Sequence, residues 1–284
     1  MSTKFQRLGA SIFIIADPEK RSSKLLELLQ ERGVPHERIP PTFLHEYPPE
    51  FNPKRSHVLS KKALTLPEIG CAKSHLECYR AFLESENNYA VIFEDDADLI
   101  DSDLDALSDL TGKFLKFAKT IPYEKPIALV YYTESANLIR LNEDFYQVIG
   151  NASHAMAYLI NRNAAKKILE RNTNIDYVAD WPRGTAIKFF FPVRQLFEHG
   201  SKNGLVKSFI EPERFSSALD LKTKLAQNLR IVTFAHYFSN FKNFNGIREY
   251  LKILWLPLIQ WQLFRAISRL IPNSQKIKSL KKKS

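Results

Sequence analysis

Short apolar runs bounded by polar, glycine or proline positions recur along the chain and predict buried strands. They occupy residues 8–16, 34–43, 89–93, 126–132, 145–149, 155–160 and 205–210. Between them, apolar residues recur with the 3.6-residue period of one helix face. These amphipathic stretches include one that ends near Gly33, one that begins at Thr65, and two at residues 104–120 and 161–169. The strand–helix–strand opening predicts an α/β fold with parallel strands.

Local signals place the ends of the first two helices. Asp17 is followed by a proline and is the predicted cap of the first helix. Thr65 and Glu68 have the spacing of a capping box at the start of the second. The polar, proline-containing residues 45–64 between these helices predict a mobile loop. Gly70 lies off the apolar stripe of the second helix, so a ligand is expected to approach closely there.

The run that begins at Tyr89 ends in three consecutive carboxylates, Glu94, Asp95 and Asp96. Neighbouring carboxylates repel one another, and a bound divalent cation would offset that repulsion. Because residues i and i+2 of a strand face the same side, Glu94 and Asp96 are predicted to converge while Asp95 points elsewhere. Hard oxygen ligands of this kind suit Mg²⁺ or Mn²⁺ shared with substrate phosphates. The alternative is a solvated acidic turn or a helix cap.

Composition favours a folded protein that works in a reducing compartment. The 284 residues are 44% hydrophobic, enough for a substantial core. Cys71 and Cys78 lie seven positions apart on one predicted helix, which excludes a bridge within that helix and gives no Cys/His zinc spacing. Both are therefore predicted to be small core residues. Residues 1–7 precede a short strand-like run and not the apolar core of a signal peptide, so a cytoplasmic location is expected.

Positive charge gathers in the last part of the chain. Residues 221–284 hold thirteen Lys or Arg and one acid, a net charge of +12 against +10 for the whole chain, which leaves −2 for residues 1–220. Residues 250–272 combine aliphatic side chains with Trp255 and Trp261, and a proline and basic residues interrupt them. This pattern predicts an amphipathic helix at a membrane interface, next to a polybasic end that attracts anionic lipid.

Two other interpretations of residues 221–284 are a helix packed on the domain and a nucleic-acid-binding tail. The bulky apolar series argues against nucleic acid, because a segment that follows phosphates needs fewer such groups. We therefore predict two parts: a catalytic domain at residues 1–220 and a membrane-association region at residues 221–284.

Two motifs at a characteristic spacing now point to a family. The sequence EIGCAKSH at residues 68–75, followed by IFEDD at residues 92–96, resembles glycosyltransferase family 25. This is the bacterial lipooligosaccharide galactosyltransferase family, which is related to collagen galactosyltransferases. The opening strand with Asp17 and Arg21 is similar to its N-terminal motif, and residues 157–176 to its later motifs. The resemblance covers residues 8–185.

The resemblance implies a glycosyltransferase type A fold, a Rossmann-like mixed sheet flanked by helices. It also implies a UDP-sugar donor, galactose as the transferred hexose, and inversion at the anomeric carbon. The acceptor would be a sugar of a lipooligosaccharide or lipopolysaccharide. The tail would hold the enzyme on the cytoplasmic face of the inner membrane, through anionic lipid.

The metal is expected to stabilise the UDP leaving group in the transition state. Asp96 is the predicted direct ligand, Glu94 faces the ribose or a metal-bound water, and Asp95 orders the loop. Inversion needs a base for the acceptor hydroxyl, for which Asp180 is the first candidate and Asp176 the second. Trp181, next in sequence to Asp180, would stack on a sugar. Either carboxylate could instead cap a helix or pair with a nearby arginine.

Further donor contacts are predicted at Asp17, Arg21, Lys73, Ser74 and His75. The two basic side chains are candidate partners for the diphosphate, or are solvated surface residues. His75 either contacts the ligand or is a packed residue.

The role of His154 and the class of enzyme each have two interpretations. His154 is expected to pack beside Met156 and not to complete a metal site. A metal-dependent nucleotidyltransferase or phosphoesterase on a similar sheet is the competing class of enzyme.

Overall fold

The computed structural model describes residues 8–19, 22–53, 56, 64–134, 137–150, 152–175, 177–179, 181–182 and 185–200. The strand predicted at residues 205–210 and the region 221–284 lie outside these ranges, as do Arg21, Asp176 and Asp180. The predictions made for them therefore stay predictions.

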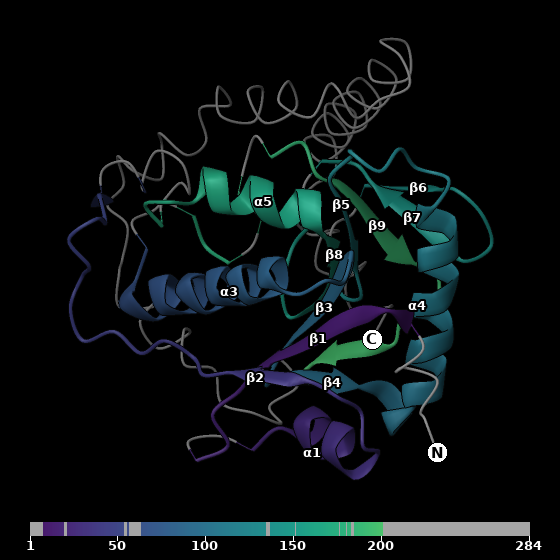
Figure 1. Cartoon of the computed structure of the whole chain (residues 1–284), viewed down its shortest axis with the longest axis horizontal. Coiled ribbons are helices and arrows are strands. Elements are labelled where there is room, and N and C mark those ends of the chain that lie inside the picture. The colour runs from purple at the N-terminus through teal and green to yellow at the C-terminus, as the bar shows by residue number, and fades with distance from the viewer. Residues whose placement is uncertain are drawn as a thin grey trace, which may run out of the picture. The chain divides into compact units, whose positions relative to one another are not determined.

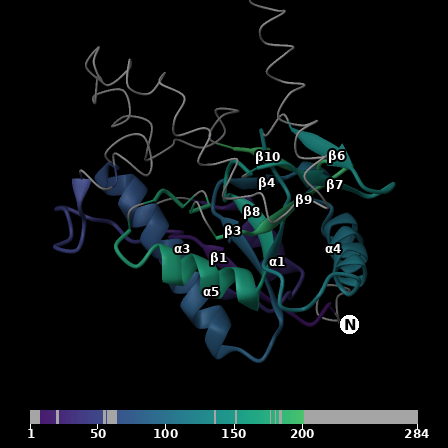
Figure 2. The same cartoon turned by 90° about the horizontal axis from the view of Figure 1, so that it is seen from above.

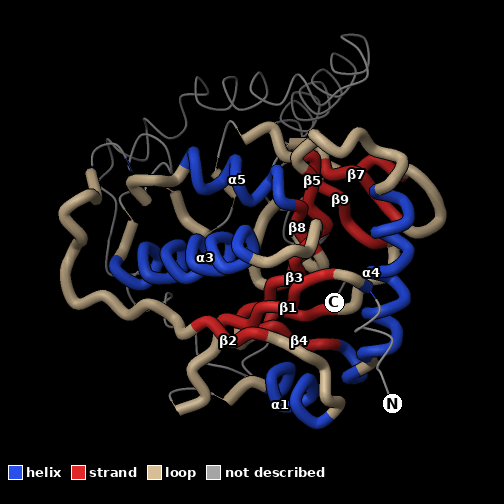
Figure 3. The backbone as a smooth tube through the Cα atoms, in the orientation of Figure 1, coloured by secondary structure: helices blue, strands red, loops and turns tan. Residues whose placement is uncertain are grey.

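The described residues form a mixed sheet of eight strands, which confirms the predicted mixed α/β fold (Figure 3). In spatial order, the strands are β2 (Glu37–Ile39), β1 (Ala10–Ile15), β3 (Tyr89–Glu94), β8 (Ala157–Asn161), β5 (Ile127–Val130), β9 (Lys188–Pro192), β7 (Phe145–Val148) and β6 (Leu138–Arg140). The first three are parallel, and β8 runs antiparallel to both of its neighbours.

Helices cover both faces of this sheet. On one face, α3 (Leu66–Glu84) lies beside α5 (Arg162–Arg171), and both pack on side chains such as Phe13 and Ile92 (Figures 1 and 2). On the other face, α1 (Lys24–Glu31) and α4 (Leu104–Ala118) pack on residues such as Ile14. Alternate residues of each strand thus enter two separate cores, as the period of two requires.

Of the two predicted helix starts, the one at Thr65 is confirmed and the one at Asp17 is wrong. The Thr65 hydroxyl accepts a hydrogen bond from the Glu68 N–H, and the Glu68 carboxylate accepts one from the Thr65 N–H, so the capping box is confirmed. Asp17, however, does not cap α1. Its carboxylate accepts from the Glu19 N–H at 3.2 Å within a turn, and Ser23 caps the helix instead. The helix therefore begins several residues later than the sequence predicted.

Four described strands escaped sequence analysis because they are short or lie among aromatic and polar residues without clear alternation. Two of them are β6 and β9 of the large sheet. The other two, β4 (Ala97–Leu99) and β10 (Phe197–His199), pair antiparallel to form a separate two-stranded sheet. A 3₁₀ turn at Ile100–Ser102 joins β4 to the segment that caps α4.

Gly70 permits a close approach, as predicted, but the approaching group is the protein's own backbone. A Cβ atom at this position would lie 2.2 Å from the carbonyl oxygen of Thr42. The Ser74 hydroxyl, one helical turn later, donates to the Gly70 carbonyl oxygen at 2.9 Å and accepts from the Thr42 N–H at 2.8 Å. The segment after β2 is thus held directly against α3, and no space remains for a ligand at Gly70.

Replacing Gly70 with alanine should lower the free energy of unfolding by about 1–3 kcal/mol, because the new methyl group forces backbone apart. Denaturant unfolding measures this change. Gly112→Ala in α4 is the matched control: its Cβ would meet only the end of Leu8 at 3.4 Å, and alanine favours the helix. Equal effects of the two substitutions would contradict the close backbone contact.

Candidate functional site

The acidic segment lies in a turn at the end of β3, where the strand stops. β3 ends at Glu94, Asp95 and Asp96 form the turn, and β4 begins at Ala97. The strand alternation that predicted a common direction for Glu94 and Asp96 therefore does not extend to Asp96. The two carboxylates have different neighbours, which define two groups of residues.

Asp96 lies beside a histidine that sequence analysis missed. Its carboxylate Oδ2 is 3.6 Å from Nδ1 of His199, and only 7% of the residue is exposed. The pairing of β4 with β10 sets this arrangement, because Ala97 is opposite His199 and the Gly200 N–H donates to the Asp96 carbonyl oxygen at 3.0 Å. β10 has only three residues, which is too short for an alternating pattern to be recognised in the sequence.

A pocket opens at the acidic turn. Its lining consists of Ser22, Lys24, Asp95, Asp96, Ala97, Asp98 and Gly200. It lies at the carboxyl ends of the parallel strands β1 and β3, whose final residues Ile15 and Glu94 are in register. Ligands of open α/β sheets bind at such an edge.

The pocket has carboxylates that suit a metal cation and a lysine that suits an anion. Three carboxylates with hard oxygen donors, and the His199 imidazole beside them, fit Mg²⁺ or Mn²⁺. Lys24 is the first residue of α1, so its ammonium group lies at the end of the helix that carries partial positive charge. Both features would attract the phosphates of a nucleotide.

His199 is itself packed in a cluster of rings. Tyr132 and His154 lie 5.8 Å and 5.4 Å from it, measured between ring centroids. Nε2 of His154 is 3.2 Å from a carboxylate oxygen of Glu134. His154 thus packs against Tyr132 and against His199, the histidine beside Asp96.

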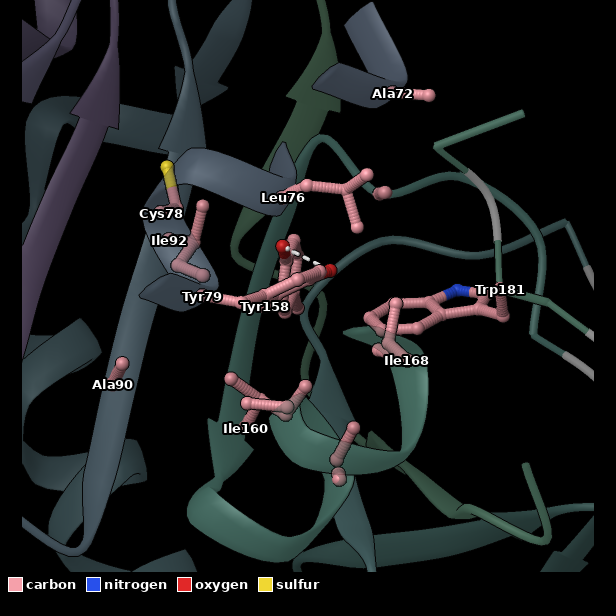
Figure 4. Close-up of a cluster of buried hydrophobic side chains, with 14 of the residues drawn as sticks. Ala72, Leu76, Cys78, Tyr79, Ala90, Ile92, Tyr158, Ile160, Ile168 and Trp181 are labelled. Carbon is pink, nitrogen blue, oxygen red and sulfur yellow. Dashed lines mark hydrogen bonds between the residues drawn. The ribbon is translucent and has the colours of Figure 1, made fainter. Parts of the chain in front are cut away.

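The second group surrounds Glu94. Nε2 of His75 is 2.8 Å from Oε1 of Glu94, and Sγ of Cys71 is 3.8 Å from the same oxygen. His75 is buried, and its Nδ1 is 2.8 Å from the hydroxyl of Tyr158, which in turn is hydrogen-bonded to Tyr79 (Figure 4). His75 is therefore packed between Tyr158 and Glu94, and its packing fixes the Glu94 side chain. Cys71, predicted to be a core residue, instead faces this carboxylate and is only half-buried.

Two other predicted donor contacts have partners within the protein. Lys73 lies 3.5 Å from the carboxylate of Glu50, and the hydroxyl of Ser74 bridges Thr42 and Gly70. Asp95 and Asp96 are together in the pocket, whereas Asp17 lies in the turn after β1. Of the predicted residues 73–75, Lys73 thus forms a partly exposed ion pair, whereas Ser74 and His75 are buried.

Trp181 is a core residue and not a sugar platform. It is 3% exposed, and its ring packs edge-on against Tyr158 with 4.8 Å between the ring centroids (Figure 4). The ring of Phe189 lies tilted against it at 4.9 Å. A ring with both neighbours in the core cannot stack on a substrate. The segment after α5 is therefore tied to the same core that orients His75.

Comparison with known families now adds an independent observation. Residues 43–181 match the model of glycosyltransferase family 25, described as an LPS biosynthesis protein. The predicted resemblance to this family is confirmed over that segment, which includes α3, the acidic turn and α5. The match supports a function as a glycosyltransferase in lipopolysaccharide biosynthesis. A comparison with curated proteins gives no significant match.

Among the described residues, no helix is both long and apolar enough to cross a bilayer.

Trp181→Ala should lower the free energy of unfolding by about 3–5 kcal/mol, because it removes a large buried ring from the core. Denaturant unfolding monitored by circular dichroism measures the change. Tyr123→Ala is the control, since Tyr123 is 63% exposed and its loss should cost far less. Unchanged stability of the Trp181 variant, with weakened acceptor binding, would contradict the core assignment.

Proposed function

We propose that this protein is an inverting glycosyltransferase of type A fold that moves a hexose from a UDP-sugar to a lipooligosaccharide or lipopolysaccharide acceptor. Galactose is the proposed hexose, and Mn²⁺ or Mg²⁺ the proposed metal. The observation that carries the proposal is the pocket at the acidic turn, where carboxylates and Lys24 meet beyond the ends of β1 and β3. This pocket includes residues 95–98 of the family-matched segment.

Each charged residue of the pocket has a proposed role. Asp96 is the direct metal ligand, and His199 is placed to be a second one, while Asp95 and Asp98 contribute negative charge. A bound divalent ion would neutralise the charge that builds on the departing diphosphate. Lys24 and the N-terminus of α1 would bind the phosphate oxygens and leave the sugar exposed to attack.

Glu94 is proposed to contact the ribose or a metal-bound water. Its orientation is set before substrate arrives, because the buried His75 holds Oε1 at 2.8 Å and Tyr158 holds the other side of the imidazole. A carboxylate fixed in this way loses little conformational entropy on binding. Asp17 is proposed to contact the nucleotide from the turn after β1, and Arg21 to bind the diphosphate.

A single displacement also requires a base that takes the proton of the acceptor hydroxyl. Asp180 is proposed for this step and Asp176 is the second candidate, on the sequence argument alone. Trp181, the next residue in sequence, is buried in the core.

Asp96→Asn should abolish Mn²⁺-dependent binding of the donor and lower sugar transfer about 10²–10³-fold, because the pocket loses its direct ligand. Thermal unfolding with UDP-sugars and Mn²⁺ measures binding, since a ligand of the folded state raises the melting temperature. Asp180→Asn is the matched variant: it should keep this stabilisation and lose transfer about 10²–10⁴-fold.

Asp109→Asn, on the exposed face of α4, is the control for the loss of one negative charge, and this variant should keep both binding and transfer. The proposal fails if Asp96→Asn keeps both Mn²⁺ binding and transfer. Release of a nucleoside monophosphate in place of UDP would indicate the nucleotidyltransferase or phosphoesterase class.

Peripheral membrane association through residues 221–284 completes the proposal, because it would hold the active site near a lipid-linked acceptor. It rests on the charge and apolar pattern of the sequence. The full chain should sediment with vesicles that contain anionic lipid, less so with neutral vesicles or at high salt. Equal sedimentation with both kinds of vesicle, or none at all, would contradict this part.

A further inference from the structure

The group formed by Cys71, His75 and Glu94 is separate from the acidic pocket. None of these three residues belongs to the pocket lining. Cys71 and His75 are one helical turn apart on α3, so they share a face, and Glu94 reaches them from the end of β3. One thiol sulfur, one imidazole nitrogen and one carboxylate oxygen lie within 4.8 Å of one another.

The two distances to the Glu94 oxygen are close to those of a metal site. Zinc binds sulfur, nitrogen and oxygen at about 2.0–2.3 Å, so tetrahedral neighbours lie about 3.3–3.8 Å apart. Sγ of Cys71 is already 3.8 Å from Oε1 of Glu94. Nε2 of His75, at 2.8 Å from that oxygen, needs to move by only about 0.5 Å to reach the tetrahedral separation.

The other nitrogen of His75 has the partner that a metal-binding histidine needs. When Nε2 binds a metal, Nδ1 carries the proton and donates it to the Tyr158 hydroxyl, and that hydroxyl can donate to Tyr79. The two tyrosines are fully buried, as Figure 4 shows, and the relay therefore fixes the orientation of the His75 ring.

The chemistry of the donors separates this group from the acidic pocket. A thiolate with an imidazole selects zinc and similar borderline ions, whereas the pocket with three carboxylates suits Mg²⁺ or Mn²⁺. Three protein ligands also leave a fourth position open. The half-buried Cys71 and a Glu94 side chain that is 23% exposed provide access to it.

We propose that Cys71, His75 and Glu94 form a second metal site, which binds Zn²⁺ with one position open to solvent or to a substrate oxygen. The binding itself does not depend on the proposed function. A consequence that does rest on the proposed function is inhibition: zinc would hold Glu94, which directly precedes the acidic turn, away from the donor.

Cobalt is the probe, because thiolate-bound Co²⁺ gives a near-ultraviolet charge-transfer band and occupies zinc sites. Titration of the full chain with Co²⁺ should produce this band, and Zn²⁺ should remove it. Cys71→Ser should abolish the band. Cys78→Ser on the same helix is the matched control and should keep it, because burial raises the pKa of the Cys78 thiol and holds it protonated.

Two further variants keep the test decisive. Tyr158→Phe retains all three ligands but removes the partner of His75, so it should weaken Co²⁺ binding about 10–100-fold without abolishing the band. Asp96→Asn should keep the band even though it loses Mn²⁺-dependent donor binding, so failure of one site does not count against the other. Circular dichroism shows that each variant is folded.

The proposal is overturned if wild type shows no band at saturating Co²⁺, or if Cys71→Ser keeps the band. Transfer assays test the consequence separately: Zn²⁺ should inhibit the wild type more strongly than Cys71→Ser, and chelation should reverse this. Equal inhibition of the two proteins would overturn the coupling to the donor site, while the cobalt band still decides whether the metal site exists.

Discussion

The parallel pairing of β1 with β3 is the constraint on which the candidate site depends. It puts the ends of both strands at one edge of the sheet, so the turn after β1 and the acidic turn after β3 lie at the same edge. The short pairing of β4 with β10 then returns the chain to this edge and delivers His199 to Asp96. Without these two pairings, the carboxylates would be an ordinary solvated turn.

The same strand end serves two groups of residues with different chemistry. Glu94 is the last strand residue and faces the buried relay of His75, Tyr158 and Tyr79 on α3 and β8. Asp96, two residues later, has turned toward the pocket. One change of backbone direction thus separates the proposed site for a borderline metal from the proposed site for a hard metal, which is why the two can be tested independently.

Sequence periodicity predicted the elements that are long and packed on one face. The strand that ends at Glu94 and the helices α3, α4 and α5 followed from it. Periodicity could not predict β10, because three residues show no repeating pattern. It also could not predict the turn at Asp96, because strand alternation ends with the strand itself at Glu94. Gly70 and Trp181 show a second limit: a small residue or an aromatic ring looks alike in sequence whether it meets a ligand or its own core.

The central claim is that Asp96 and His199 hold the metal that neutralises a departing nucleotide diphosphate. The most direct measurement is anomalous diffraction from crystals of the protein grown with Mn²⁺ and UDP. The account predicts a manganese peak within bonding distance of Asp96 and in contact with both phosphates, with His199 beside it. A bound UDP with no manganese at Asp96, or with its phosphates away from the acidic turn, would contradict it.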